Sequence, residues 1–368
     1  MITDNVLNRT ERLRQQMNSM GLDAVVLMVS EGANWQSVYY ISGFRGSSSG
    51  VVVTEKDAFL ITDGRYLSQA SEQSPYTLVT QGSRTMLEAV CELLKDQKCH
   101  RIGVEKDIVS IRNFEKMSAI MSLVEWYDTS SILPLLRRTK DSSEVDSIRK
   151  AGQIASDAYR EVLGHVSLGM TEKEFEALLE YTVKKLGAEG GWGNHNFIVA
   201  SGARSALPHG APTDKAFQSG DWVTVDFGAM VNGYLSDITR NFCLGAPNEK
   251  AREIESLLLR AHREAALALK PGVSGRDIDA IARRIIVEEG YGEQFSHGLG
   301  HALGLEIHEN PRLSPLSHDI LQVGDVVTVE PGVYFPGVGG MRIEDDYLIT
   351  ETGAERISGD LQQELAVL

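Results

Sequence analysis

Gly220-Asp-Trp-Val-Thr-Val-Asp-Phe-Gly228 is matched by Gly324-Asp-Val-Val-Thr-Val-Glu-Pro-Gly332, at a constant offset of 104 residues, from 220 to 324. Both segments are β-branched runs that follow a Gly-Asp turn and carry a carboxylate near the end, which is typical of a strand. Upstream, Thr171-Glu-Lys-Glu174 and Ser274-Gly-Arg-Asp277 are helix-start signals, and each opens an amphipathic stretch. Two copies of a helix followed by a strand predict a pseudo-symmetric α+β domain whose halves bring acidic groups to a shared centre. Chance similarity of two Gly-Asp strands is the alternative interpretation.

The first part of the chain predicts a second, separate domain. Apolar residues recur at helical spacing from Val6 to Met20, and short buried-strand patterns follow at residues 23–28, 50–53 and 58–61. Helical stretches at residues 85–94 and 111–123 alternate with these runs, which indicates a mixed α/β domain. A polar segment begins at residue 137, before a long helical stretch at 144–163. We therefore expect an α/β two-domain protein, with residues 1–137 as the first domain and 138–368 as the second.

Composition limits the classes of partner. The 368 residues include 36 basic and 51 acidic side chains, and the formal charge of -15 disfavours nucleic acid and anionic membranes as partners. Residues 1–20 are polar and charged, unlike a signal peptide, and no run approaches the length of a membrane span. The three cysteines form neither an even set nor a CxxC pair, as expected of free thiols. We expect a cytoplasmic protein.

A hairpin turn sets the geometry of two aspartates in the first copy. Asn232-Gly233 lies between apolar-rich runs and predicts a two-residue turn that pairs Val231 with Tyr234. Gly228 then faces Asp237, and Asp226 points to the same face as Asp237 because side chains alternate along a strand. Diagonal neighbours of this kind lie about 7–8 Å apart at the backbone. Their carboxylates can share a cation, and without one they would repel each other.

The second copy adds two more acids and an imidazole. Glu330 takes the place of Asp226, and Glu344 follows after a longer connection. Four converging carboxylates are costly without positive charge, so a pair of metal ions is the economical explanation, and oxygen-rich sites suit Mn(II) or Co(II). The imidazole comes from His297-Gly-Leu-Gly-His301, where the glycines argue against a helical zinc motif and predict a loop. Any one of these residues alone would be interpreted as an ordinary surface or core residue.

These residues resemble the pita-bread metallopeptidases, which include Xaa-Pro aminopeptidase, prolidase and methionine aminopeptidase. The resemblance rests on the motifs around the acids and on the HGLGH run, and it covers essentially the whole chain. Tyr39-Tyr-Ile-Ser-Gly-Phe44 and Thr62-Asp-Gly-Arg-Tyr66 resemble the creatinase-type N-terminal domain, which methionine aminopeptidases generally lack. One segment departs from the family: residues 191–197 stand where relatives often carry a Ser-Phe-type sequence, which leaves the detailed specificity of the pocket open.

The resemblance implies the roles of individual residues. Two divalent metal ions, Mn(II) foremost and Co(II) or Zn(II) as alternatives, would be bound by five ligands, with Asp237 and Glu344 bridging. The five ligands are Asp226, Asp237, His301, Glu330 and Glu344. The resemblance also assigns His209, His297 and His308 to the substrate pocket and implies a homodimer.

A mechanism follows as a hypothesis. Glu330 would accept a proton from the attacking water, and His297 or His209 would stabilise the tetrahedral intermediate. We expect His209 and His308 near the proline ring. Arg342 is interpreted either as a contact to the substrate carboxylate or as a partner of the acidic ligands.

The expected activity is that of an Xaa-Pro aminopeptidase acting on peptides with proline in second position, and prolidase, an Xaa-Pro dipeptidase, is the alternative. Two remote alternatives share the fold: a metal-free amidinohydrolase of creatinase type and a non-catalytic binding protein. The complete set of five ligands argues against both.

Overall fold

The computed structural model describes residues 2–193 and 195–368. The chain divides into two compact units, Met1–Arg137 and Arg138–Leu368. The expected α/β class, with two domains of which the second is pseudo-symmetric, is confirmed by the architecture of each unit. None of the helices in the described part of the chain is long and apolar enough to cross a membrane.

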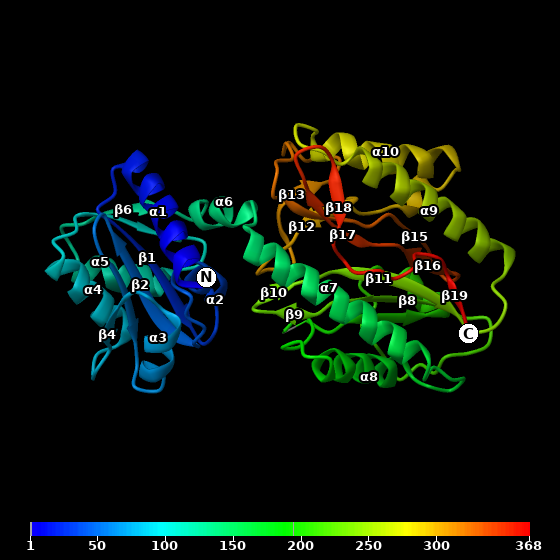
Figure 1. The fold of residues 1–368 in the computed structure, drawn as a ribbon, viewed down its shortest axis with the longest axis horizontal. Helices are drawn as coiled ribbons and strands as arrows, with labels where there is room; N and C mark the ends of the chain where they lie inside the picture. The colour runs from blue at the N-terminus through cyan, green and yellow to red at the C-terminus, as the bar shows by residue number, and fades with distance from the viewer. Residues whose placement is uncertain (1, 194) are drawn as a thin grey trace. The chain divides into compact units, whose positions relative to one another are not determined.

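The first unit is a six-stranded mixed sheet with helices around it, drawn in blue and cyan in Figure 1. The strand order is β4-β3-β2-β1-β5-β6, with β1 antiparallel to β2 and parallel to β5. Its elements are α1 (Ile2–Met20), β1 (Ala24–Ser30), α2 (Trp35–Ser42), β2 (Ser48–Thr54), β3 (Ala58–Thr62), α3 (Leu67–Gln73), β4 (Thr77–Thr80), α4 (Met86–Asp96), β5 (Arg101–Val104), α5 (Ile111–Ile120), β6 (Glu125–Asp128) and α6 (Ile132–Arg138). The predicted helix and strand patterns of this region are confirmed.

The second unit contains two larger sheets, each packed against its own pair of helices. One sheet has the order β19-β11-β8-β7, and the other β13-β12-β14-β17-β18. The first half contains α7 (Ser142–Leu163), α8 (Glu172–Lys185), β7 (Ile198–Ser201), η1 (Gly202–Ala206), β8 (Trp222–Phe227), β9 (Met230–Val231), β10 (Tyr234–Leu235) and β11 (Ile238–Cys243). The second half contains α9 (Glu249–Ala268), α10 (Gly275–Glu288), η2 (Gly292–Gln294), β12 (Gly300–Ala302), β13 (Glu309–Leu313), β14 (Val326–Val329), β15 (Gly332–Phe335), β16 (Gly339–Arg342), β17 (Asp345–Ile349), β18 (Ala354–Arg356) and β19 (Ala366–Val367). Figure 1 shows α7 and α8 on one side of these sheets and α9 and α10 on the other.

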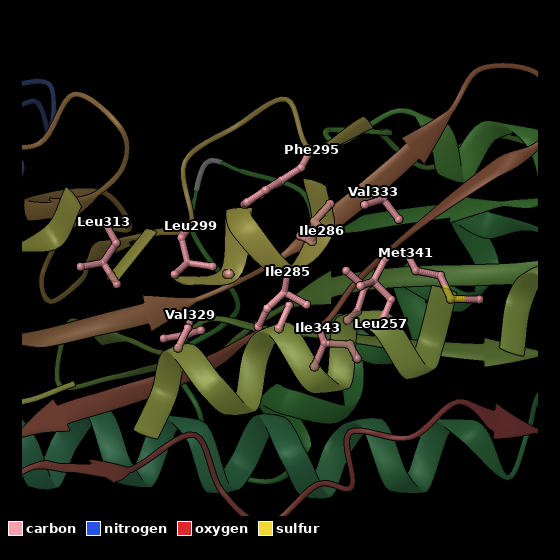
Figure 2. Packing of buried hydrophobic residues seen from close by; sticks show 14 of the residues in the cluster. Leu257, Ile285, Ile286, Phe295, Leu299, Leu313, Val329, Val333, Met341 and Ile343 are labelled. Atoms are coloured by element: carbon pink, nitrogen blue, oxygen red, sulfur yellow. The ribbon is translucent and has the colours of Figure 1, made fainter. Parts of the chain in front are cut away.

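The two predicted helix starts are real caps. The Thr171 hydroxyl accepts a hydrogen bond from the backbone N–H of Glu174, and the Glu174 carboxylate accepts one from the backbone N–H of Thr171. This capping box places the start of α8 at Glu172. Ser274 accepts the backbone N–H of Asp277 at the start of α10. Each helix then buries an apolar stripe, and Figure 2 shows the stripe of α10 within the buried cluster of the second half, at Ile285 and Ile286.

The predicted register of the first half is confirmed. Val231 pairs with Tyr234 across the turn, where Asn232 and Gly233 have φ values of 51° and 80°. These positive values are those of the hairpin turn that Asn-Gly favours. The longer pair β8 and β11 continues the register, with Asp226 opposite Thr239.

The second half repeats this plan and contacts the first at several points. Val329 pairs with Asp345 between β14 and β17, which brings Glu330 and Glu344 to facing ends of these strands. An isolated antiparallel bridge joins Thr239 to Glu344. The acidic ends of both sheets therefore converge at the seam between the two halves.

Candidate metal centre

Four acids from strand ends converge in one cavity of the second unit. Asp226 is the penultimate residue of β8 and Asp237 precedes β11, whereas Glu330 follows β14 and Glu344 precedes β17. All four line a cavity of about 1070 Å³, together with His301 of β12. Asp237, His301 and Glu344 each offer one ligand atom, and these atoms lie within 4.8 Å of one another. The structure thus brings together all five residues that the sequence analysis proposes as ligands.

The carboxylates are buried, and the protein's own side chains do not compensate all of their negative charge. Burial, followed by repulsion from neighbouring acids, raises the pKa of Asp237 and of Glu344 well above the ordinary values. Burial also raises the pKa of Glu330, to about 8, although Arg342 opposes the shift. Asp226 Oδ1 and Asp237 Oδ1 are buried and have no hydrogen-bond partner among the described residues. Buried, unsatisfied carboxylate oxygens are the donor set of a divalent cation, so these residues fit the expected metal.

Arg342 is the buried cation of the centre. Its Nη2 donates to Asp226 Oδ2 at 2.6 Å, and its Nε donates to Thr239 Oγ1 at 3.0 Å. Thr239 in turn donates to Glu344 Oε2 at 2.7 Å. These contacts correspond to the interpretation of Arg342 as a partner of the acids, whereas its contact with substrate stays a prediction.

His301 presents a free imidazole lone pair to the acids. Its Nδ1 lies 3.1 Å from Ala302 O, so the ring donates from Nδ1 and leaves Nε2 unprotonated. Nε2 faces Glu330 Oε1 at 3.4 Å and Asp237 Oδ2 at 3.7 Å. Burial lowers the pKa of His301 to about 3, which keeps the ring neutral, as a metal ligand must be.

The loop predicted for the HGLGH run is only partly correct. Residues 297–299 are irregular, but Gly300 and His301 belong to β12. A Cβ at Gly300 would lie 2.1 Å from Thr328 O, so glycine allows β12 to approach β14 closely. The glycine therefore serves strand packing at this position.

The three pocket histidines differ in their surroundings. His297 donates from Nδ1 to Gly298 O at 2.7 Å and accepts at Nε2 from Tyr334 Oη at 3.0 Å, and burial lowers its pKa to about 4. His308 stands edge-on to His301, with ring centroids 4.4 Å apart. His209 lies exposed at the cavity wall. Both ring nitrogens of His297 are thus engaged within the protein, whereas His209 and His308 are exposed at the cavity.

Three residues of the site were missed by the sequence analysis: Thr239, Tyr334 and Arg312. Arg342 donates to Tyr334 Oη at 2.8 Å, which directs the tyrosine hydroxyl to His297. Arg312 pairs with His301 across β12 and β13 and lines the cavity. The alternation of exposed Arg312 with buried Pro311 and Leu313 is a sequence signal that places the arginine on the open face.

Known proteins share these sequences and this fold. Residues 9–139 match the creatinase/prolidase N-terminal domain, and residues 146–351 match metallopeptidase family M24. The chain is 38% identical to the Xaa-Pro dipeptidase of Pyrococcus furiosus over 351 residues, which cover 95% of this chain and 97% of that one.

Solved structures agree with the sequence matches. The Xaa-Pro dipeptidase from Bacillus anthracis superimposes with a TM-score of 0.93 at 38% identity, over 99% of this chain and 100% of that chain. The X-Pro aminopeptidase from Thermotoga maritima superimposes with a TM-score of 0.91 at 37% identity, over 96% and 100%. With both domains matched and the acids and imidazole gathered as described, the chain belongs to metallopeptidase family M24.

Proposed function

We propose that the protein is an Xaa-Pro dipeptidase that uses two divalent metal ions, with Mn(II) the expected metal. The dipeptidase alternative of the sequence analysis is preferred here to the aminopeptidase, because the similar proteins whose names state an activity are more often called dipeptidase or prolidase than aminopeptidase. The observation that carries this choice is the position of Arg312 in the cavity.

Arg312 is a cation placed to bind a free carboxylate. It stands opposite His301 on the neighbouring strand, and its side chain has no hydrogen-bond or ion-pair partner among the described residues. Its charge acts on the same site, because it lowers the pKa of His308 after the effect of burial. A dipeptide carries an α-carboxylate on its proline, one residue from the scissile bond, whereas a longer peptide has an amide there. A guanidinium binds a carboxylate through two parallel hydrogen bonds and therefore distinguishes the two.

The five proposed ligands would hold the metal pair, which supplies a nucleophile of lowered pKa and polarises the scissile carbonyl. Asp226, Asp237, His301, Glu330 and Glu344 are these residues. Arg342 and Thr239 keep two of these carboxylates in place through the hydrogen bonds described above.

The remaining steps belong to side chains of the protein. Glu330 would accept the proton of the attacking water, because burial makes its carboxylate more basic than an ordinary glutamate. His209 is the expected donor to the oxygen that becomes negative as the carbonyl turns tetrahedral. His297 would act indirectly, since Gly298 and Tyr334 occupy both its nitrogens. His308 contributes to the wall of the proline subsite.

The test compares a free dipeptide with its amide. Chelator-treated protein is assayed on Ala-Pro, Ala-Pro-amide and Ala-Pro-Ala, with and without Mn(II) or Co(II), and Asp237→Asn serves as the inactive control. We expect metal-dependent cleavage of Ala-Pro and a strong preference over the amide. Arg312→Met should remove that preference by raising KM for Ala-Pro about 10-fold or more, while KM for the amide stays nearly constant.

If the protein is an aminopeptidase, the opposite substrate preference is expected. The Thermotoga maritima protein shows that the same fold carries that name. Efficient cleavage of Ala-Pro-Ala, unaffected by Arg312→Met, would establish an aminopeptidase. No cleavage of any of the three substrates with either metal would refute the peptidase mechanism. The homodimer implied by the resemblance is also part of the proposal, and its mass can be measured by light scattering.

A further inference from the structure

We propose that Asp279 and Arg283 of α10 form a positioning pair that fixes the segment 295–299 and, through it, the metal ligands Glu330 and His301. Neither residue of the pair lines the cavity, but Arg283 bonds the backbone of His297, which does. The role of the pair rests on the proposed function of the centre, which it serves through the backbone.

The pair satisfies the backbone of every second residue of that segment. Arg283 donates from Nη1 to Phe295 O at 3.0 Å and from Nη2 to His297 O at 2.7 Å. Asp279 Oδ1 accepts the N–H of Leu299 at 3.0 Å. The segment belongs to no strand, so side chains of α10 satisfy backbone groups that a sheet would otherwise pair.

The same segment also contacts the backbone of a proposed metal ligand through Leu299. Leu299 O accepts the N–H of Glu330 at 2.8 Å, so the Leu299 residue is held between Asp279 on one side and Glu330 on the other. Gly300 and His301 follow immediately as β12. A displacement of Leu299 therefore moves the backbone of two proposed ligands, which come from different strands.

The Arg283 side chain is held in a fixed orientation by Asp279 and Phe295. Arg283 and Asp279 form two hydrogen bonds, at 2.7 Å and 2.9 Å, and the Asp279 side chain is only 2% exposed. The guanidinium lies 4.2 Å from the centre of the Phe295 ring, and that ring stands edge-on to His297 at 5.1 Å. Below the segment, Phe295 and Leu299 pack in the buried cluster that also contains Ile286 of α10 (Figure 2). This packing fixes α10 relative to the backbone groups that Asp279 and Arg283 bind.

The first half has a counterpart at the equivalent position. Under the 103-residue offset of the two helix starts, Arg283 corresponds to Glu180 of α8. Glu180 accepts the N–H of Gly191 at 3.1 Å, in the segment that leads to the cavity residues Trp192 and His195. In both halves a side chain at this helix position therefore binds the backbone of a pocket segment. The side chain is the acidic Glu180 in α8 and the basic Arg283 in α10.

The same helix supplies a matched control. Arg284 and Glu288 are also four residues apart, but their closest atoms are 4.0 Å apart and both side chains are mostly exposed. Arg284→Met removes the same charge and the same length of side chain from α10 as Arg283→Met does. It leaves the segment 295–299 untouched.

The experiment measures metal binding and turnover separately. Metal-stripped wild type, Arg283→Met, Arg283→Lys, Asp279→Asn and Arg284→Met are titrated with Co(II) and followed by its visible absorption, and kcat and KM are then determined on Ala-Pro. Loss of an outer-shell partner costs about 10–100-fold in metal affinity or activity. We expect Arg283→Met to lose at least 10-fold in Co(II) affinity and in kcat, with KM changed much less. Arg283→Lys keeps the charge but has only three donors for the four hydrogen bonds that Arg283 makes, so it should recover only part of the loss, and Arg284→Met should match wild type.

Three results would overturn the proposal: a folded Arg283→Met with wild-type affinity and kcat, an equal loss in Arg284→Met, or full recovery in Arg283→Lys. If Arg283→Met does not fold, Asp279→Asn and Arg283→Lys decide, since wild-type affinity in both refutes the positioning role. If wild type fails to cleave Ala-Pro, the proposed function falls, and the Co(II) titration still tests the pair by itself.

Discussion

Removal of the metal should make the stability of this protein fall as pH rises from about 4.5 to about 8, because of Glu330. Its pKa is raised by burial from the ordinary 4.5 to about 8 in the folded protein. A carboxyl with a raised folded pKa contributes its full stability below the unfolded pKa and loses it as pH rises through the folded value. At 1.36 kcal/mol per pH unit, the loss across this window is about 5 kcal/mol, or about 3 kcal/mol if solvent at the 15% exposed side chain relaxes the effect.

The assay is urea unfolding at pH 5, 6, 7 and 8, in chelator and in saturating Mn(II). Bound metal compensates the carboxylate charge and adds stability by mass action, so the difference between the two series should widen as pH rises. Glu330→Gln removes the titrating group while keeping its size, and the pH slope attributed to Glu330 should disappear from the chelator series. The comparison cancels the titration of groups that do not interact with Glu330, which excludes Asp237 and Glu344.

A flat chelator series between pH 5 and 8, or an identical slope in Glu330→Gln, would refute the reasoning. In either case the repulsion among the acids must be relieved without protonation of Glu330. A change in the urea dependence between the two series would indicate a more expanded metal-free state, and calorimetry would then replace the linear extrapolation.

Three further predictions follow from single contacts. Tyr334→Phe removes the donor to His297 Nε2, and we expect kcat to fall about 10-fold with Co(II) affinity unchanged; a larger effect on the metal would contradict this. His262 is buried and its pKa is lowered to about 4, so its contribution to stability is present above about 6.5 and is lost as pH falls toward 4. His262→Asn should therefore flatten the acid side of the stability profile by about 3 kcal/mol in urea unfolding, and an unchanged profile would contradict the assignment. Glu172 accepts the N–H groups of Ser201 and Thr213, which bracket His209, so Glu172→Gln should raise KM for Ala-Pro more than it lowers kcat; normal steady-state kinetics would refute this.

Sequence patterns were sufficient where a local turn sets the geometry. Asn232-Gly233 alone determines which residues of β8 and β11 face each other, and the two-residue period then places Asp226 and Asp237 on one face. The capped helix starts at Thr171 and Ser274 were equally local. Each of these features depends on contacts within a few residues.

Patterns failed where the contact spans the two halves. Thr239 lies opposite Asp226 and donates to Glu344, 105 residues away, so its threonine could only be interpreted as an ordinary strand residue. Arg312 is placed at the site by the pairing of β13 with β12, and Tyr334 by its hydrogen bonds to Arg342 and His297. Short irregular segments such as that around His301 carry no periodicity, and the strand there depends on how close β14 approaches Gly300.

The two halves differ in which residue faces the first acid of each copy. In the first half, Asp226 faces Thr239, and Asp237 lies diagonally across from it. In the second, the register Val329 to Asp345 brings Glu330 to face Glu344 directly. Glu344 thus takes the cross-strand position that Thr239 has in the first half, and the two meet at the bridge that joins the sheets. Because Thr239 both donates to Glu344 and accepts from Arg342, one hydroxyl connects the acids of the second half to the only buried arginine that contacts Asp226 among the described residues. The repeat accounts for the four carboxylates. The difference between Thr239 and Glu344 at the equivalent position lets the Thr239 hydroxyl link the acids of the second half to those of the first.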